Sequence, residues 1–177
     1  MVSGPLTLII GGARSGKSSY AERLVMALPP PWIYAATGAA LDAEMAERIK
    51  AHRARRGDGW TTIEAPRDLA GVLAAQANAP VLVDCLTLWL SNLMMADAEV
   101  EAEIERLCMA LSRVPAPVFL VANEVGCGIV PDNALARRFR DCQGLLNQRM
   151  AAQADRVVLL VAGVPLFIKG GPDGRSQ

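Results

Sequence analysis

The segment GGARSGKS, residues 11–18, constrains the fold of this chain more than any other. It fits the pattern G-x-x-x-x-G-K-[ST], with Gly11, Gly16, Lys17 and Ser18 in register. An apolar run, LTLII, precedes it and the helical segment SSYAERLVMAL follows it, which is the strand-to-helix context that the pattern requires. Glycines there let backbone N–H groups point at phosphate oxygens, and the helix N-terminus adds partial positive charge. The segment therefore predicts a phosphate-binding loop.

Phosphate chemistry needs a cation and metal ligands beside such a loop. Lys17 is expected to reach the β- and γ-phosphates, and the Ser18 hydroxyl is expected to bind Mg²⁺. A second acid at the end of a buried strand usually completes the magnesium site, and Asp84 after the run VLV fits that position. A strand-ending aspartate that caps the next helix would look the same in the sequence. Glu124 follows the next apolar run, where it either contacts a ligand or is a hydrogen-bonded structural acid.

Short apolar runs alternate with helical segments along the chain. Near-continuous apolar strands are typical of a parallel sheet that helices cover on both faces, so the pattern predicts an α/β fold of three layers with a mainly parallel sheet. A last apolar stretch, PLFIK, follows its predecessor too closely for a crossover helix, and we expect it to pair antiparallel at the sheet edge. The expected strands cover residues 6–10, 32–36, 81–86, 118–122, 156–163 and 165–169.

Apolar periodicity and capping residues predict two long helices. Residues 97–113 carry acids early and an arginine late, as the helix dipole favours. Residues 131–153 begin with a proline, with Asp132 or Asn133 as the N-cap. The side chains expected to face the core are Val100, Ile104, Leu107 and Leu111 in the first helix and Leu135, Phe139, Cys142 and Leu146 in the second.

The composition limits the size and the partners of the protein. A chain of 177 residues with 52% hydrophobic residues can bury one substantial core, so we expect a single domain over residues 1–170 and a frayed tail over 171–177. Basic and acidic residues both number 18, so no overall charge attracts the chain to nucleic acid or to a membrane surface. The N-terminal apolar run is too short for a membrane span, and we expect a cytoplasmic protein.

Several classes of nucleotide-binding protein compete at this point. A regulatory GTPase would carry N-K-x-D and D-x-x-G motifs, and the segments ANEVG and VDCLT supply neither. An ATPase that works on nucleic acid would need a basic face with aromatic residues, whereas aromatics make up 5% of this chain. The four cysteines form no C-x-x-C pair, which speaks against a zinc site or a disulfide framework. A small-molecule kinase stays open.

The only histidine, His52, belongs to the segment DAEMAERIKAHRARR at 42–56, which we expect to be a helix. Arg48, Arg55 and Arg56 lie four residues before, three after and four after it, so guanidinium groups can surround the ring. Nearby cations disfavour imidazolium and leave a nitrogen lone pair available. A neutral imidazole beside a phosphate clamp suits nucleophilic attack on phosphorus, but a solvated surface histidine on a basic helix has the same sequence.

Several segments together resemble a known family. In chain order they are GGARSGKSSYAE, YAATG, DAEMAERIKAHRARR, VDCLTLWLSNL, NEVGCGIVPDNALARRFRDCQGLLNQRMAAQAD and VAGVPLFIK. Over nearly the whole chain they resemble the bifunctional adenosylcobinamide kinase/adenosylcobinamide-phosphate guanylyltransferases of cobalamin biosynthesis. A phosphate loop alone is unspecific, whereas its combination with NEVGCGIVP and RDCQGLLNQ is specific.

The resemblance implies a RecA-like P-loop NTPase fold, a homotrimer and two activities. The first phosphorylates adenosylcobinamide with ATP or GTP. The second transfers GMP from GTP to adenosylcobinamide phosphate through a guanylylated histidine, for which His52 is the matching residue. Mg²⁺ is the expected cofactor, with Ser18 and Asp84 as its ligands. The nucleotide contacts that the resemblance implies are Gly11, Gly12, Ala13, Arg14, Ser15, Gly16, Lys17, Ser18, Ala36, Thr37, Gly38, Arg53, Ala54, Arg55, Arg56, Glu64 and Asp84.

Two other functions are compatible with the residues. The chain could be a P-loop kinase for another small alcohol, in which His52 is structural. It could also be a non-enzymatic, nucleotide-dependent assembly module whose basic helix contacts a neighbouring subunit. Covalent labelling by GTP, turnover without labelling, and binding alone would distinguish the three functions.

Overall fold

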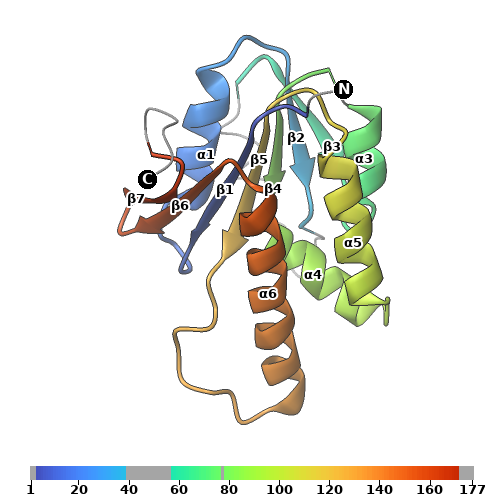
Figure 1. Ribbon diagram of the computed structural model, residues 1–177, viewed down its shortest axis with the longest axis vertical. Helices are drawn as coiled ribbons and strands as arrows, with labels where there is room; N and C mark the ends of the chain where they lie inside the picture. The colour runs from blue at the N-terminus through green and yellow to red at the C-terminus, as the bar shows by residue number, and fades with distance from the viewer. Residues whose placement is uncertain (1–2, 39–56, 77, 172–177) are drawn as a thin grey trace.

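The computed structural model describes residues 3–38, 57–76 and 78–171. Within them the chain forms a central sheet with helices on both faces (Figure 1). The elements, in chain order, are β1 (Leu6–Gly11), α1 (Lys17–Met26), β2 (Trp32–Ala36), β3 (Trp60–Glu64), α3 (Leu69–Ala75), β4 (Val81–Asp84), α4 (Leu86–Met95), α5 (Val100–Leu111), β5 (Val118–Asn123), α6 (Ala134–Gln153), β6 (Arg156–Val161) and β7 (Val164–Lys169).

The described strands form one seven-stranded sheet in the order β3-β2-β4-β5-β1-β6-β7. Neighbouring strands pair parallel, except that β7 pairs antiparallel with β6 at the edge. The register places Gly11 opposite Asn123 and Ala36 opposite Asp84. The mainly parallel α/β sheet and its antiparallel C-terminal edge strand are therefore confirmed, and the carboxyl ends of the parallel strands meet at one edge, where such folds bind ligands.

Both faces of the sheet are covered, which explains the continuous apolar runs. The helices α3, α4, α5 and α6 contribute to the core on one face, and α1 contributes to the core on the other (Figure 1). Leu8 and Ile9 are successive residues of β1, enter different cores, and are both 0% exposed. A buried side chain of this size contributes about 1.5–3 kcal/mol by leaving water, so a strand of this kind is stable only between two layers.

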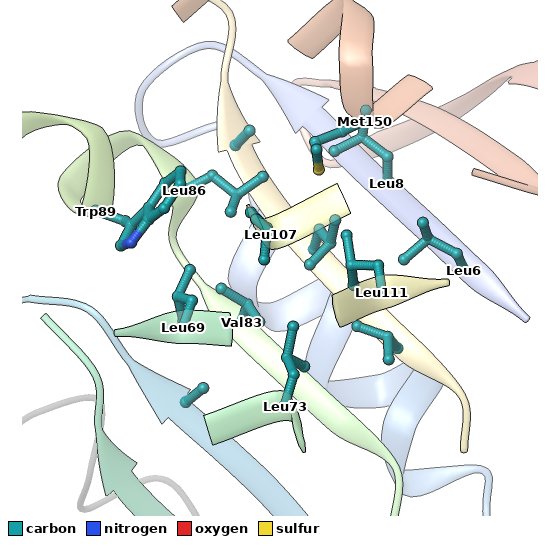
Figure 2. Close-up of a cluster of buried hydrophobic side chains, with 14 of the residues drawn as sticks. Leu6, Leu8, Leu69, Leu73, Val83, Leu86, Trp89, Leu107, Leu111 and Met150 are labelled. Carbon is teal, nitrogen blue, oxygen red and sulfur yellow. The ribbon is translucent and has the colours of Figure 1, made fainter. Parts of the chain in front are cut away.

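The larger core lies between the sheet and α3, α4, α5 and α6. Figure 2 shows Leu107 and Leu111 of α5 beside Leu73 of α3, with Met150 of α6 at the other end of the cluster. The predicted inward stripe of α5 is confirmed, because all four of its side chains are buried. Truncation of Leu107 to alanine would cost about 2–5 kcal/mol of stability, because it would leave a cavity in this core.

The start of α6 differs from the expectation at one residue. Asn133 caps the helix as predicted, since its Oδ1 accepts from the N–H groups of Leu135 at 2.8 Å and Ala136 at 3.1 Å. Leu146 is buried, but Leu135 is 64% exposed and was wrongly expected to face the core. The reason is that the first turn of α6 extends beyond the edge of the sheet (Figure 1). No helix in the described part of the chain, α6 included, has the length and apolar character needed to cross a membrane.

The sequence also gave no indication of β3. Its residues Trp60–Glu64 pair parallel with β2. They form one edge of the sheet, and β7 forms the opposite edge. The strand has no continuous apolar run, because it lies at an edge and its side chains are only partly buried. Trp60 lies 5.4 Å from Trp32 between ring centroids, so aromatic packing joins this edge to β2.

Candidate functional site

The phosphate loop connects the end of β1 to the start of α1. Gly16 is the N-cap of α1 with φ of 93°, a left-handed conformation that glycine adopts without steric cost. No side chain caps α1 and its first turn contains no acidic residue, so the first N–H groups and the positive end of the helix dipole are suited to an anion. A Cβ at Gly11 would lie 2.5 Å from the carbonyl oxygen of Leu160, so only glycine fits where the loop passes β6. The local structure is that of the predicted phosphate loop.

Lys17, the first residue of α1, points back into this loop. Its Nζ donates to the carbonyl oxygen of Gly12 at 2.5 Å and to Ser15 Oγ at 3.4 Å, and the residue is only 7% exposed. Burial lowers the pKa of Lys17, and the nearby Cys85 and Asp84 side chains oppose that shift. The ammonium group is therefore held in a poorly solvated position, where a phosphate group would be a strong partner.

Asp84 ends β4 close to this lysine. Its Oδ2 accepts from the hydroxyl of Tyr34 at 3.0 Å, a contact between strands that the sequence did not reveal. Cys85, and not Asp84, is the N-cap residue of α4, and no side chain caps that helix. Asp84 therefore does not cap α4, and its carboxylate lies close to Lys17 of the phosphate loop.

The parallel register aligns three predicted site residues in one row. Ala36 at the end of β2 lies opposite Glu64 of β3 on one side and opposite Asp84 of β4 on the other. In-register residues of parallel strands project to the same side of the sheet, so the two carboxylates share a face two strands apart. The ligand-binding edge of the sheet therefore extends from the phosphate loop past Asp84 and Ala36 to Glu64 on β3.

Thr37, directly after β2, is fully buried and connects this row to β4. Its Oγ1 accepts from the N–H of Cys85 and also lies 2.7 Å from the carbonyl oxygen of Cys85, to which it donates. The N–H of Thr37 donates to the carbonyl oxygen of Asp84 at 3.3 Å. The predicted nucleotide contact at Thr37 stays a prediction, and in this structure the hydroxyl holds the backbone of β4 in place.

Asn92 extends the same network to the loop after β3. Its Nδ2 donates to the carbonyl oxygens of Thr37 at 2.8 Å and Pro66 at 2.9 Å, and Trp89 Nε1 donates to the carbonyl oxygen of Arg67 at 2.7 Å. Asn92 is buried, so its donors are not shared with solvent. The sequence reasoning missed this residue. The sequence does contain an indication of its role, because Asn92 is a lone amide inside the apolar segment LTLWLSNLMM, where a buried polar side chain needs a hydrogen-bond partner.

Glu124 follows β5 at the same edge, and its carboxylate is hydrogen-bonded within its own turn. Its carboxylate accepts from the N–H groups of Gly126 at 2.6 Å and Cys127 at 3.2 Å. Its own N–H donates to the carbonyl oxygen of Gly11 at 3.0 Å, so the turn after β5 is tied to the phosphate loop. Burial raises the pKa of Glu124, but these hydrogen bonds outweigh burial and leave the pKa below its ordinary value.

The donor groups beside the loop fit a magnesium ion. Ser18 supplies a hydroxyl one residue after Lys17, and Asp84 supplies a carboxylate, which are the oxygen ligands that Mg²⁺ prefers. The described residues contain no group of three His, Cys, Asp or Glu side chains that could hold a metal. A magnesium ion in a nucleotide site needs only one or two protein ligands besides phosphate and water, so the set is sufficient.

The remaining predicted residues lie outside the described part of the chain. They are His52, Arg53, Ala54, Arg55 and Arg56, together with the helix expected over 42–56. The structure thus brings together the phosphate loop, Asp84, Ala36 and Glu64 at one edge of the sheet. Thr37 and Gly38 lie at the end of β2, where the chain leaves the described residues.

Comparisons with known proteins agree with this geometry. The family model "Cobinamide kinase / cobinamide phosphate guanyltransferase" matches residues 7–168. The chain is 47% identical over 169 residues to the bifunctional adenosylcobalamin biosynthesis protein CobP of Pseudomonas aeruginosa, and 43% identical over 181 residues to the bifunctional protein CobU of Salmonella typhimurium. Each match covers 93% of this chain and 98% or 99% of the relative, so both proteins are similar over nearly their whole length.

Solved structures with similar folds are much more distant in sequence. The flagellar accessory protein FlaH of Methanocaldococcus jannaschii has a TM-score of 0.57 at 13% identity, covering 96% of this chain and 80% of that one. The KaiC-like protein PH0186 of Pyrococcus horikoshii has a TM-score of 0.50 at 11% identity, covering 89% and 71%. At these identities the likeness concerns the fold alone.

Proposed function

The chain belongs to the family of cobinamide kinases and cobinamide phosphate guanyltransferases, and we propose from this membership that it carries out both reactions. It phosphorylates adenosylcobinamide with ATP or GTP, then transfers GMP from GTP to adenosylcobinamide phosphate, which yields adenosylcobinamide-GDP. The observation that carries the proposal is the buried Lys17 beside Asp84 in the phosphate loop of a chain that matches bifunctional relatives over nearly their whole length.

In the kinase step, the hydroxyl oxygen of the acceptor bonds to the γ-phosphorus. The bond between that phosphorus and the β–γ bridging oxygen breaks, the nucleoside diphosphate leaves, and the hydroxyl loses its proton. Lys17 and the N-terminus of α1 stabilise the charge that develops on the phosphate oxygens. Mg²⁺ held by Ser18 and Asp84 would neutralise further charge on the same oxygens when bound.

In the transfer step, a ring nitrogen of His52 bonds to the α-phosphorus of GTP, and pyrophosphate leaves as the α–β phosphate bond breaks. The resulting phosphoramidate is then attacked by a phosphate oxygen of adenosylcobinamide phosphate, which releases the histidine. His52 is the only histidine of the chain, which supports its assignment as the nucleophile. Arg53 through Arg56, Glu64 and the segment Ala36–Gly38 are the proposed contacts for this GTP.

Labelled GTP tests the covalent intermediate. Incubation with Mg²⁺ and α-labelled GTP should place an acid-labile, base-stable label on the protein, as expected for a phosphoramidate. His52→Ala should lose the label and GMP transfer while retaining kinase activity with adenosylcobinamide. Full GMP transfer by that variant would exclude His52 as the nucleophile. Turnover of ATP with another alcohol, together with no label and no reaction with adenosylcobinamide, would favour a kinase of different specificity.

The assembly, the domain limits and the location of the protein are also proposals. We infer a homotrimer of single-domain subunits spanning residues 1–170, located in the cytoplasm. Ile129, Val130 and Leu135 are exposed apolar side chains on and near the start of α6, which supports a contact between subunits there. Analytical ultracentrifugation should give three times the 18.8 kDa mass of one chain. A mass of one chain at micromolar concentration would exclude the trimer.

A further inference from the structure

Tyr34 of β2 contacts the carboxylate of Asp84, which ends the neighbouring strand β4. Tyr34 pairs with Leu82, and Asp84 lies two residues beyond Leu82 in the same strand. Side chains two residues apart share a face of a sheet, and Tyr34 and Leu82 both belong to the core that α1 covers. The Tyr34 hydroxyl donates to Asp84 Oδ2 at 3.0 Å. Asp84 therefore lies on the face of the tyrosine ring, one step closer to the ligand-binding edge.

The ring that carries this hydroxyl is held by its surroundings. Tyr34 is only 5% exposed. Its ring meets that of Trp60 edge-on, with 6.1 Å between the centroids, and Trp60 in turn packs against Trp32. A buried aromatic side chain in a close-packed core keeps one orientation. The hydroxyl consequently donates from a fixed position, and the hydrogen bond sets the orientation of the Asp84 carboxylate.

This hydrogen bond orients Asp84 without neutralising its charge. A carboxylate has two oxygens with about four lone pairs, so one donor on Oδ2 leaves Oδ1 for a metal ion or a metal-bound water. A hydroxyl is a neutral donor, whereas a lysine or arginine at the same place would compete with Mg²⁺ for the carboxylate. Carboxylates that bind metal ions are commonly oriented in this way by a hydrogen-bond donor behind them.

We propose that Tyr34 is a positioning residue for the magnesium ion of the nucleotide site and acts through the Asp84 carboxylate. The inference rests on the proposed magnesium site, and it involves neither the acceptor nor the histidine. Without the hydroxyl, the Asp84 side chain can rotate, and this freedom is lost when the ion binds. Loss of the hydroxyl should therefore weaken the binding of Mg²⁺ and leave the binding of metal-free nucleotide unchanged.

Nucleotide binding with and without magnesium tests this role. The affinities of the wild type and Tyr34→Phe for AMP-PNP are measured calorimetrically in saturating Mg²⁺ and in EDTA. By the thermodynamic cycle, the ratio of these two affinities equals the ratio of the Mg²⁺ affinities of bound and free AMP-PNP. The ratio should be about 10–100-fold smaller in Tyr34→Phe, the usual effect of removing a group that orients a metal ligand. The affinities in EDTA should be equal.

Two further variants show whether the hydroxyl acts through Asp84. Tyr20→Phe is the matched control, because it removes the hydroxyl of the other tyrosine, whose ring lies 5.7 Å from the guanidinium of Arg23. It should leave the ratio unchanged. Asp84→Ala completes a double-mutant cycle, and in that background Tyr34→Phe should not reduce the ratio further. Tyr34→Met also lacks the hydroxyl, and it repeats the comparison if Tyr34→Phe does not fold.

Three outcomes would overturn the inference. An unchanged ratio in Tyr34→Phe, with a reduced ratio in Asp84→Ala, would show that Asp84 holds the ion without the tyrosine. Equal weakening in EDTA and in Mg²⁺ would mean that the hydroxyl supports the whole pocket and not the metal site. An unchanged ratio in Asp84→Ala would contradict the proposed magnesium site together with this inference. No acceptor is present, so a lack of activity toward adenosylcobinamide would contradict the proposed function without affecting these results.

Discussion

The ligand-binding edge consists of two parts that are built in different ways. The phosphate loop, from Gly11 to Ser18, has internal short-range bonds, such as that from Lys17 to Gly12, five residues apart, besides the bond from Glu124 that ties it to the end of β5. The part around Thr37 and Asn92 depends on side chains that bond to backbone far away in the sequence. Asn92 donates to a carbonyl 55 residues away and to another 26 residues away. The proposed phosphate-binding groups thus belong to a local motif, while the surrounding part of the edge is positioned by residues far away in the sequence.

This difference predicts different responses to mutation. In the phosphate loop, glycine conformations and one lysine are arranged for a ligand, so a substitution there should affect catalysis more than folding. In the Thr37–Asn92 network, buried donors and acceptors satisfy each other, so a substitution there should affect folding first. Four substitutions test the contrast, and they are ordered by the size of the expected effect.

Lys17→Ala should reduce kinase kcat by about 10²–10³-fold, because it removes a donor that stabilises charge on the transferred phosphate. The free energy of unfolding of the variant at neutral pH should not be lower than that of the wild type. Burial lowers the pKa of Lys17, so the folded state disfavours the charged form, and the charged lysine opposes folding at any pH below its folded pKa. Steady-state kinetics and urea unfolding measure the two effects. A large loss of stability with normal kcat in the folded fraction would contradict a catalytic role for this lysine.

The same contrast explains which features could be predicted from the sequence. The phosphate loop was predictable because a local motif specifies it, and the buried strands were predictable because each is a continuous apolar run. The edge strand β3 was not predictable, because WTTIE is short, half-buried and carries two threonines. Periodicity also gave the wrong orientation for Leu135, because it cannot indicate where a helix extends past the sheet.

Site residues follow the same division. Lys17 and Asp84 were identified from a motif and a strand end, and they lie close enough to interact electrostatically. The bond from Tyr34 to Asp84 spans 50 residues, and no local pattern indicates such a partner. Glu124 was left between two roles, and the sequence gives no sign of the N–H groups of Gly126 and Cys127 that its carboxylate accepts from in this structure. Contacts of this kind depend on the folded chain and not on spacing.

Asn92→Ala should lower the free energy of unfolding by about 2–3 kcal/mol. The substitution leaves the carbonyl oxygens of Thr37 and Pro66 without the amide that now satisfies both, in a site shielded from solvent. Urea denaturation of the variant, beside Gln148→Ala at an exposed position of α6, measures the difference. Equal stability of the two variants would show that the network does not hold this part of the edge together.

Thr37→Val should cost about 1–2 kcal/mol, less than the loss at Asn92, because the shape is kept and only the hydroxyl is removed. The N–H of Cys85 would then lose its partner beside the fully buried Thr37 position, whereas the carbonyl oxygen of Cys85 still accepts from the N–H of Trp89. Thr61→Val on the exposed side of β3 is the control for the change of residue type. A stable Thr37→Val variant whose affinity for GTP is strongly reduced would instead favour a direct nucleotide contact at Thr37.

Glu124→Gln should have the smallest effect, below about 1 kcal/mol, because solvent screens this partly exposed carboxylate. Hydrogen bonds from Gly126 and Cys127 outweigh burial and hold the pKa of Glu124 below its ordinary value of 4.5. The folded state thus binds the proton less tightly than the unfolded state, so the carboxylate stabilises the fold above pH 4.5, and this contribution disappears as the pH falls through the folded pKa. Urea unfolding of wild type and variant between pH 3 and 7 should show a gap that is constant near neutral pH and closes in acid. A gap that persists unchanged at pH 3 would mean that shape, and not charge, makes this side chain important to the turn that joins β5 to the phosphate loop.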